Sequence, residues 1–499
     1  MNFSIIKRTL GWLLIFEAIF MLVPTLTAIV YAEWITLGAI LASMGACLLV
    51  GAVCLAFKVK SDAIYAKEGM VIVASSWIVL SLFGALPFWF SREIPSYIDA
   101  LFESVSGFTT TGATILTGEV ALGTPDGYLA MSKSLLTWRS FTHWVGGMGV
   151  LVFIMAFLPL SGARNMHIMK AESPGPIVGK LVPRVRTTAK ILYAIYFGLT
   201  VMEFIFLLCG QMSVFDALNT AFATAGTGGF SIRTDGFAGY SSYLQWVVTV
   251  FMFLFSINFN AYFLILCGKI KDAFNLEVRV FIGIFVAAIA LITINVYTTA
   301  SELYQYTFSE ALRHSAFSLA SVISTTGFAT ANFDLWPSFS KCLLVLAMFI
   351  GACAGSTGGG IKVSRVVVLY KGATHEMKRA LHPKQVKKIS MDGRIVEHEV
   401  VRNTNAFIII YILLFIVSML LVTLDPATAA VSDNALVTNF TATLATLNNI
   451  GPGLDAVGPV GNFAFYNPFS KLVFIFNMLA GRLELFPMLI LLHPATWKK

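Results

Sequence analysis

The chain has 499 residues, of which 57% are hydrophobic and only 12% are charged, and its net charge is +8. Soluble domains carry roughly twice that charged fraction, so the composition excludes an ordinary soluble protein. Membrane proteins keep an excess of Lys and Arg on the cytoplasmic side, and this bias explains the positive charge better than nucleic-acid binding does. We therefore expect a multi-pass membrane protein with no nucleic-acid partner.

Ten apolar stretches are long enough to cross a lipid bilayer as helices, which takes about 20 residues. They lie roughly at 9–31, 35–57, 71–91, 141–160, 190–209, 244–267, 278–297, 341–370, 406–424 and 469–492. The first is too long for a signal peptide and is interpreted as a retained anchor. Three connections are basic, at 58–68, 161–189 and 371–403. Placing them in the cytoplasm gives an even number of crossings, with both termini cytoplasmic.

Four shorter segments, near 97–108, 214–225, 308–324 and 433–447, are too short to cross. Each begins with a polar residue followed by Ala-Leu, and each ends in a cluster of Thr, Asn and Gly. Aligned on one glycine, the clusters read Thr109-Thr110-Thr111-Gly112-Ala113, Ala225-Gly226-Thr227-Gly228-Gly229, Ser324-Thr325-Thr326-Gly327-Phe328 and Asn448-Asn449-Ile450-Gly451-Pro452. This pattern predicts four copies of span, half-helix, polar loop and span, with two extra spans in front.

The predicted fold is an all-α polytopic membrane protein. Four span–pore-helix–loop–span repeats surround one pseudo-fourfold pore, and two N-terminal transmembrane helices precede them. The expected divisions are a two-helix extension at 1–68 and repeats at 69–186, 187–275, 276–403 and 404–499. The third repeat includes a broken second helix and a basic cytoplasmic loop.

The four loops suggest an ion path. Non-helical backbone at membrane depth is tolerated only where it is buried in protein or lines water. Loops converging on one axis can present rings of backbone carbonyls that replace the hydration shell of a cation. A divalent ion would usually need carboxylate ligands, and the four clusters contain none, which favours K⁺ or Na⁺. The alternative, ordinary loops or close helix contacts, explains one such cluster better than four equivalent ones.

A second unusual stretch is FIGACAGSTGGGIKVSR, from Phe349 to Arg365, which interrupts the expected span 341–370. Each glycine inside a helix costs about 1 kcal/mol relative to alanine, and a glycine-interrupted span indicates a functional position in transporters. The alternative is a close helix crossing. Lys362, just past the break, could repel cations or extend to the membrane surface.

Arg482 lies inside the last expected span. A charge at that depth is costly, so a functional role is the default interpretation. The alternative is a structural ion pair with Glu484 or Glu203.

Over its whole length the chain resembles the Trk/Ktr/HKT family of potassium transporters, in particular the bacterial TrkH/TrkG pore subunits. The resemblance rests on Thr-Thr-Gly-Ala (110–113), Trp-Val-Gly-Gly-Met-Gly (144–149), Ala-Gly-Thr-Gly-Gly-Phe-Ser (225–231), Thr-Thr-Gly-Phe-Ala-Thr (325–330), Asn-Asn-Ile-Gly-Pro-Gly (448–453) and Gly-Arg-Leu-Glu (481–484). It implies K⁺ selectivity, with Gly112, Gly228, Gly327 and Gly451 as the filter glycines. In the second repeat, Gly226 then replaces the Thr or Asn of the other copies.

The resemblance assigns two sets of residues. The expected ion filter consists of Thr110, Thr111, Gly112, Gly226, Thr227, Gly228, Thr325, Thr326, Gly327, Asn449, Ile450 and Gly451. The expected gate is an intramembrane loop that obstructs the pore, together with an arginine below the filter. Its residues are Gly355, Ser356, Thr357, Gly358, Gly359, Gly360, Lys362 and Arg482.

The resemblance also implies partners and a location. A TrkA-like cytoplasmic nucleotide-binding regulatory subunit would dock on the basic segments 161–189 and 371–403, which could alternatively contact anionic lipid. The chain would form a homodimer with one pore per chain in the bacterial cytoplasmic (inner) membrane. K⁺ would be the transported ion, with no organic cofactor in this chain. Symport with H⁺ or Na⁺, and permeation by Na⁺, stay open.

An enzyme is the competing class of function. An intramembrane serine hydrolase using Ser356 would need a histidine at membrane depth on a neighbouring span. Of the seven histidines, five fall at cytoplasmic or interface positions. The other two, His143 and His314, lie toward the outer ends of their segments. A phosphate-binding loop is excluded because Ile361 separates Gly360 from Lys362 and no strand precedes them. We therefore expect no enzymatic activity.

Overall fold

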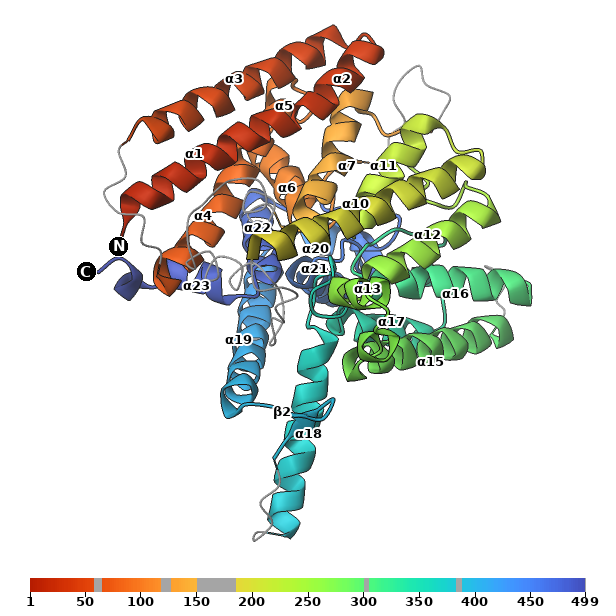
Figure 1. The fold of residues 1–499 in the computed structure, drawn as a ribbon. Helices are drawn as coiled ribbons and strands as arrows, with labels where there is room; N and C mark the ends of the chain where they lie inside the picture. Colours follow the sequence, from red (N-terminus) through yellow and green to blue (C-terminus); the bar gives the residue numbers. More distant parts are fainter. Residues whose placement is uncertain (58–64, 118–126, 150–184, 300–304, 383–387, 499) are drawn as a thin grey trace.

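The structure is a computed structural model that describes residues 1–57, 65–117, 127–149, 185–299, 305–382 and 388–498 (Figure 1). Helices dominate these residues. The two strands among them, β1 (Ser390–Met391) and β2 (Arg394–Ile395), form a short antiparallel hairpin in the basic segment after the third repeat. The predicted all-α membrane fold is confirmed.

Six stretches are long and apolar enough to cross a membrane without interruption, and they match six of the ten predicted spans. They are α1 (Phe3–Phe20) with α2 (Leu22–Val30), α3 (Trp34–Ala56), α4 (Ala66–Gly84) with α5 (Leu86–Phe90), α10 (Val185–Cys209), α15 (Leu276–Thr298) and α19 (His398–Thr423). They comprise the two N-terminal spans and the first span of every repeat.

The four predicted half-helices are present within a few residues of their expected bounds. They are α6 (Tyr97–Phe108), α11 (Val214–Ala225), α16 (Phe308–Ile323) and α21 (Ala435–Asn448). Local hydrogen bonds explain why the first three begin where they do. The hydroxyls of Ser96, Ser213 and Thr307 accept from backbone N–H groups in the first turn, which satisfies donors that a helix start leaves open.

In the second, third and fourth repeats, the second span is not a continuous helix. The pairs are α12 (Ser242–Phe255) and α13 (Phe259–Leu266), which bend by 90°, α17 (Ser338–Phe349) and α18 (Val363–Leu381), and α22 (Pro468–Arg482) and α23 (Phe486–Leu492). In the first repeat α7 (Lys133–Gly147) ends early, and the rest of the predicted span 141–160 lies outside the described residues.

The sequence predicted such a break only in the third repeat, so the expectation of uninterrupted spans at 244–267 and 469–492 is wrong. The physical reasons are local. Asn258 accepts a hydrogen bond from the N–H of Asn260 and so starts a new helix. Glu484 and Leu485 have positive φ angles of 54° and 68°, which a helix cannot contain. The remaining short helices are α14 (Ile270–Ala273), α20 (Ala427–Val431), η1 (Phe333–Leu335), η2 (Asp455–Val457) and η3 (Pro494–Thr496).

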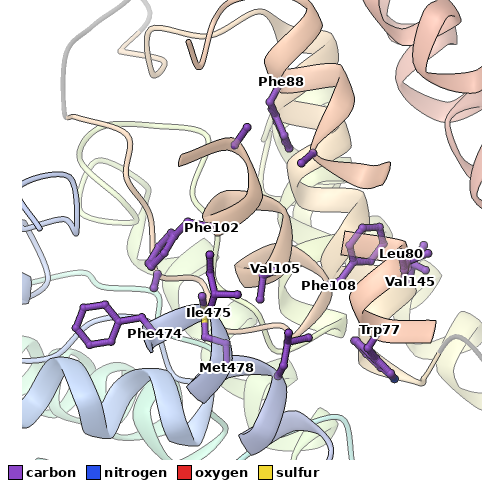
Figure 2. Packing of buried hydrophobic residues seen from close by; sticks show 14 of the residues in the cluster. Trp77, Leu80, Phe88, Phe102, Val105, Phe108, Val145, Phe474, Ile475 and Met478 are labelled. Atoms are coloured by element: carbon purple, nitrogen blue, oxygen red, sulfur yellow. The ribbon is translucent and has the colours of Figure 1, made fainter. Parts of the chain in front are cut away.

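The repeats are arranged as a closed circle. The helix that follows each loop packs against the half-helix of the next repeat: α7 against α11, α12 against α16, α17 against α21, and α22 against α6. Figure 2 shows the last of these contacts, in which Phe474 and Met478 of α22 lie beside Phe102 of α6, while Phe108 of α6 lies beside Leu80 of α4. The fourth repeat therefore packs directly against the first.

Two features lie at the edge of this circle. The rings of Phe3 and Trp497 stack with their centroids 6.3 Å apart, which brings the two ends of the chain together. Helix α18 extends away from the helical bundle with the hairpin beside it (Figure 1). The Lys371 ammonium donates to the carbonyl of Ser390 over 2.6 Å and so connects α18 to that hairpin.

Candidate functional site

The four half-helices end in the same backbone turn. At an equivalent position each loop has a non-glycine residue with positive φ: Thr110 (56°), Thr227 (53°), Thr325 (60°) and Asn449 (55°). The N–H of the next residue then bonds to the carbonyl five residues earlier, in the pairs Thr111–Ser106, Gly228–Ala223, Thr326–Ser321 and Ile450–Ala445. This is a Schellman-type helix end. Holding a non-glycine residue there costs roughly 1–2 kcal/mol, so the surrounding contacts must enforce it.

The shared turn corrects the alignment of the second repeat. Two residues after each of these positions stands a glycine with positive φ: Gly112 (77°), Gly229 (72°), Gly327 (90°) and Gly451 (96°). Gly229, not Gly228, is therefore the equivalent of Gly112. Thr227, not Gly226, occupies the Thr/Asn position, so the expected replacement there is also wrong. Adjacent glycines in the sequence do not reveal which one takes the left-handed conformation.

The four loops contact one another in a closed ring. A Cβ atom added to Gly112 would lie 2.0 Å from the carbonyl oxygen of Gly228, and one on Gly229 would lie 1.8 Å from that of Thr326. A Cβ on Gly327 would lie 2.2 Å from the carbonyl oxygen of Ile450. The ring closes at Gly451, whose added Cβ would lie 2.7 Å from the carbonyl oxygen of Thr111. Each glycine is thus required twice, by its φ and by a neighbouring backbone.

An open cavity of about 130 Å³ lies against one side of this ring. Its lining includes one glycine from every loop, Gly112, Gly229, Gly327 and Gly451, and two arginines, Arg139 and Arg233. The ring is thereby reached from outside the helical core.

The glycine-rich break lies against the helix ends of the loops. Ile350 pairs with Ile361, which closes the intervening residues into one loop, here called the break loop (351–362). The N–H of Gly359 donates to the Thr325 hydroxyl over 2.6 Å. A Cβ on Gly359 would lie 2.4 Å from the carbonyl oxygen of Asn448. The break loop therefore contacts the third and fourth ring segments.

Other contacts fix the break loop on its remaining sides. The N–H of Cys353 donates to the carbonyl of Ser256 over 3.0 Å, at the bend between α12 and α13. Glu277, at the start of α15, accepts from the N–H groups of Ala354 over 2.7 Å and Ser364 over 3.2 Å. A single carboxylate oxygen of Glu277 thus binds Ala354 within the loop and Ser364 in the first turn of α18.

Lys362 lies inside the break loop. Its side chain is buried, and its ammonium donates to the carbonyl of Gly358. Of the two alternatives for Lys362, extension to the membrane surface is therefore excluded. Ser356 donates to the carbonyl of Cys353 over 2.7 Å, so its hydroxyl also serves the fold of the loop.

Arg482 connects the end of α7, the break loop and the first ring segment. Its guanidinium donates to the carbonyls of Gly146 and Gly147 over 2.5 and 2.7 Å, at the end of α7. It also donates to the carbonyl of Thr357 over 2.8 Å and to the hydroxyl of Thr110 over 3.2 Å. The guanidinium of Arg482 is thus hydrogen-bonded both to the first ring segment and to the break loop.

The proposed ion pair of Arg482 with Glu484 is not what the structure contains, because Glu484 pairs with Arg365. Residues two apart on a helix face different sides, and the break after Arg482 turns Glu484 toward the start of α18. Arg365 and Glu277 were not identified from the sequence. Arg365 lies inside the expected span 341–370 and Glu277 directly precedes the span 278–297, and a charge at such a position is a signal that could have identified both.

Comparisons with known proteins identify the family of this chain. Residues 37–499 match the family described as TrkH, cation transport protein. The Trk system potassium uptake protein TrkH of Escherichia coli (strain K12) is 36% identical over 511 aligned residues, covering 100% of both chains. TrkG of the same strain is 31% identical over 437 residues, covering 87% of this chain and 86% of TrkG. The crystal structure of the potassium transporter TrkH from Vibrio parahaemolyticus has a TM-score of 0.85 at 33% identity, covering 100% of both chains. The chain therefore belongs to the TrkH family of cation transport proteins.

Proposed function

We propose that the chain takes up potassium ions through the ring formed by its four loops. The observation that carries this proposal is the closed cycle of contacts among Gly112, Gly229, Gly327 and Gly451. Equivalent backbone carbonyls in such a ring can replace the hydration shell of an alkali ion. The ring segments contain no carboxylate, so a divalent ion is disfavoured. The matched relatives are named potassium uptake proteins, which supports K⁺ over Na⁺ as the cargo.

The four half-helices also favour a cation at the ring. All four finish at the ring, so the negative ends of their dipoles meet where a cation would sit. In this proposal the filter keeps the residues expected from the sequence, gains Gly229, and uses Gly226 as the helix end of its segment. The carbonyls at Thr111, Gly228, Thr326 and Ile450 are the equivalent ligands.

The break loop and Arg482 would form the gate. A cation that leaves the ring on the side of the helix ends meets the charges of Arg482 and Lys362, and both are held by carbonyls of the same loop. For the gate to open, the break loop must lose its contacts with Thr325, Asn448 and Arg482 at the same time. Helix α18 begins directly after the loop, so a force on α18 reaches it without an intervening hinge.

Control would come from a partner in the cytoplasm. The relatives are named as parts of a Trk system, and we assign this chain a TrkA-like nucleotide-binding regulatory subunit. Its docking surface would be the extended helix α18 with Lys371, Lys378 and Arg379, and the adjoining hairpin. The other basic segment, 161–189, lies mostly outside the described residues. We further propose a homodimer in the bacterial cytoplasmic membrane, with both termini in the cytoplasm and with the repeat divisions given above.

The chain is a transporter and not an enzyme, because the family and its relatives transport cations. The hydrolase hypothesis for Ser356 is therefore rejected. K⁺ is cargo, and no organic cofactor is assigned to this chain.

Growth of a bacterium that lacks its own K⁺ uptake systems tests the proposal. The chain, expressed with a Trk regulatory subunit, should restore growth at low K⁺. Gly112→Ala should abolish the rescue, since the new methyl group collides with Gly228. Gly198→Ala is the matched control, because nothing lies within 4 Å of the added atom. Absence of rescue by the unaltered chain with its partner would contradict the proposal, and equal uptake of Na⁺ would favour the Na⁺-permeable alternative.

A further inference from the structure

The second ring segment is the only one of the four that has no side chain at the position after the left-handed residue. At the position after the left-handed residue, the other loops carry Thr111, Thr326 and Ile450, whereas the second carries Gly228. The Thr111 hydroxyl accepts a hydrogen bond from the Asn449 amide over 2.9 Å. The Thr326 hydroxyl bonds to Ser324 over 2.6 Å. Gly228 has no side chain with which to do the same.

A histidine from the first repeat fills the empty space. A Cβ added to Gly228 would lie 2.2 Å from Cγ of His143, so the imidazole ring occupies the volume of the missing side chain. His143 lies on α7 and is fully buried. Its Nδ1 lies 2.7 Å from the carbonyl oxygen of Gly107, and its Nε2 lies 3.2 Å from the backbone N of Phe230. Because a carbonyl only accepts and an N–H only donates, the ring must be neutral, with its proton on Nδ1.

One helical turn earlier on α7, Arg139 makes a parallel connection. Its Nε lies 2.5 Å from the carboxylate of Glu103, with the two side chains 2% and 0% exposed. Its Nη1 donates to the carbonyl of Ser231 over 2.7 Å, and its guanidinium carbon lies 3.5 Å from the centroid of the Phe230 ring. Glu103 in turn accepts from the Thr114 hydroxyl over 3.0 Å. The first and second segments are thereby joined beside the ring.

The two connections have the same form. Arg139 and His143 are four residues apart on α7, and their partners Glu103 and Gly107 are four residues apart on α6. Each side chain of this α7 pair (Arg139 and His143) reaches α6 on one side and the second ring segment on the other. Residues four apart share a helix face, so the pair acts as two rungs between the same two elements.

We infer that the α7 pair positions the second ring segment from the first repeat, and that K⁺ over Na⁺ selectivity depends on its hydrogen bonds. The inference rests on the proposed potassium uptake and goes beyond it, because it assigns two residues outside the four loops that position one ring segment. A larger ion is distinguished from a smaller one only if the carbonyls cannot close around the smaller one. The second segment has one internal side-chain hydrogen bond, from the Thr227 hydroxyl to the carbonyl of Gly226 over 2.7 Å, but at Gly228 the restraint must come from another element.

Replacement of His143 separates hydrogen bonding from space filling. In His143→Gln, the amide offers one donor and one acceptor in place of the two ring nitrogens, so both contacts can be kept. In His143→Phe, the ring volume is kept and both hydrogen bonds are lost. Initial rates of K⁺ and Na⁺ uptake are measured in K⁺-depleted bacteria that lack their own K⁺ uptake systems and supply the regulatory subunit. We expect His143→Gln to keep the K⁺/Na⁺ rate ratio, and His143→Phe to lower it about tenfold or more, because both buried hydrogen bonds of the ring are lost.

Arg139→Lys is the second variant. An ammonium keeps the charge opposite Glu103 but cannot also reach the Ser231 carbonyl with a fixed fork, so the ratio should fall while K⁺ uptake continues. Size-exclusion profiles of the purified variants report folding. If His143→Phe does not fold, the K⁺/Na⁺ rate ratio of Arg139→Lys tests the inference.

The outcomes are distinct. The inference is overturned if His143→Phe keeps the wild-type ratio, if His143→Gln loses it as strongly as His143→Phe does, or if Arg139→Lys folds and keeps it. Failure of the unaltered chain to take up K⁺ would instead contradict the proposed function.

Discussion

The guanidinium of Arg482 donates a hydrogen bond to the backbone carbonyl of Thr357 over 2.8 Å, and this contact joins the fourth repeat to the break loop of the third. The same group holds the carbonyls of Gly146 and Gly147 at the end of α7. A single side chain therefore connects three of the four repeats directly below the ring. Removing it should release the loop without disturbing the ring glycines.

Arg482→Ala should raise K⁺ flux in the absence of the regulatory subunit by about tenfold or more. Each hydrogen bond from a charged group contributes roughly 1.5–3 kcal/mol, and 1.4 kcal/mol corresponds to a tenfold change. The K⁺ flux of Arg482→Lys should lie between that of Arg482→Ala and that of the unaltered protein, because an ammonium cannot reproduce the planar fork of donors. Flux into proteoliposomes containing the purified chain measures the effect. A flux in Arg482→Ala no higher than that of the unaltered protein would show that the arginine does not hold the pore closed.

Glu277 is predicted to control the same loop from its other side. Glu277→Ala removes the acceptor for the N–H groups of Ala354 and Ser364, so partner-independent flux should rise severalfold. Glu277→Gln is the control. Both hydrogen bonds end on the same oxygen, Oε1, and an amide oxygen can accept them in the same way. The prediction fails if the Gln variant leaks as much as the Ala variant in the same proteoliposome assay.

The corrected alignment of the second segment has a consequence of its own. Gly229→Ala should abolish K⁺ uptake as fully as Gly112→Ala, since its φ is +72° and an added Cβ would lie 1.8 Å from a backbone oxygen of Thr326. Gly45→Ala, with nothing within 4 Å, should leave uptake unchanged. Uptake by K⁺-depleted cells is the measurement. Wild-type uptake by Gly229→Ala would argue against its equivalence to Gly112.

The start of α16 allows a prediction about stability and pH. The backbone N–H and then the hydroxyl of Thr307 donate to Glu310 and lower the pKa of that exposed carboxyl below its usual value. A lowered pKa in the folded state contributes stability above the unfolded pKa of about 4.3, and the contribution is lost as pH falls through the folded pKa. Glu310→Gln should therefore lower the Tm of the detergent-solubilised chain at pH 7, and the difference from wild type should shrink toward pH 4. A difference that grows toward acid pH would contradict the capping role.

Local pattern was enough to predict part of this molecule. The half-helices could be predicted because their Ala-Leu starts and their Thr, Asn and Gly ends are encoded side by side in the sequence. The meeting of the four loops could be predicted because that pattern occurs four times at equivalent positions in the chain. The first spans could be predicted because they are continuous apolar helices of membrane length.

The remainder depends on contacts between distant residues. The bend after α12 is stabilised by the N–H of Phe259, which donates to the carbonyl of Gly355, almost a hundred residues away in the chain. Nothing in the apolar stretch 244–267 encodes that partner. Gly228 is likewise required by a distant residue, His143, whose ring fills the space beside it. Three hydrogen bonds of Arg482 end on backbone carbonyls, which carry no signal in a sequence.

The most direct test of the account is the position of a bound alkali ion. Crystals of the chain grown with Rb⁺ in place of K⁺ would show anomalous scattering from the ion. We expect a peak on the axis enclosed by the loops of Gly112, Gly229, Gly327 and Gly451, within coordination distance of equivalent carbonyl oxygens from all four. Anomalous peaks found only away from this axis, or beside one or two of the loops alone, would contradict the claim that the four loops form a single ion path.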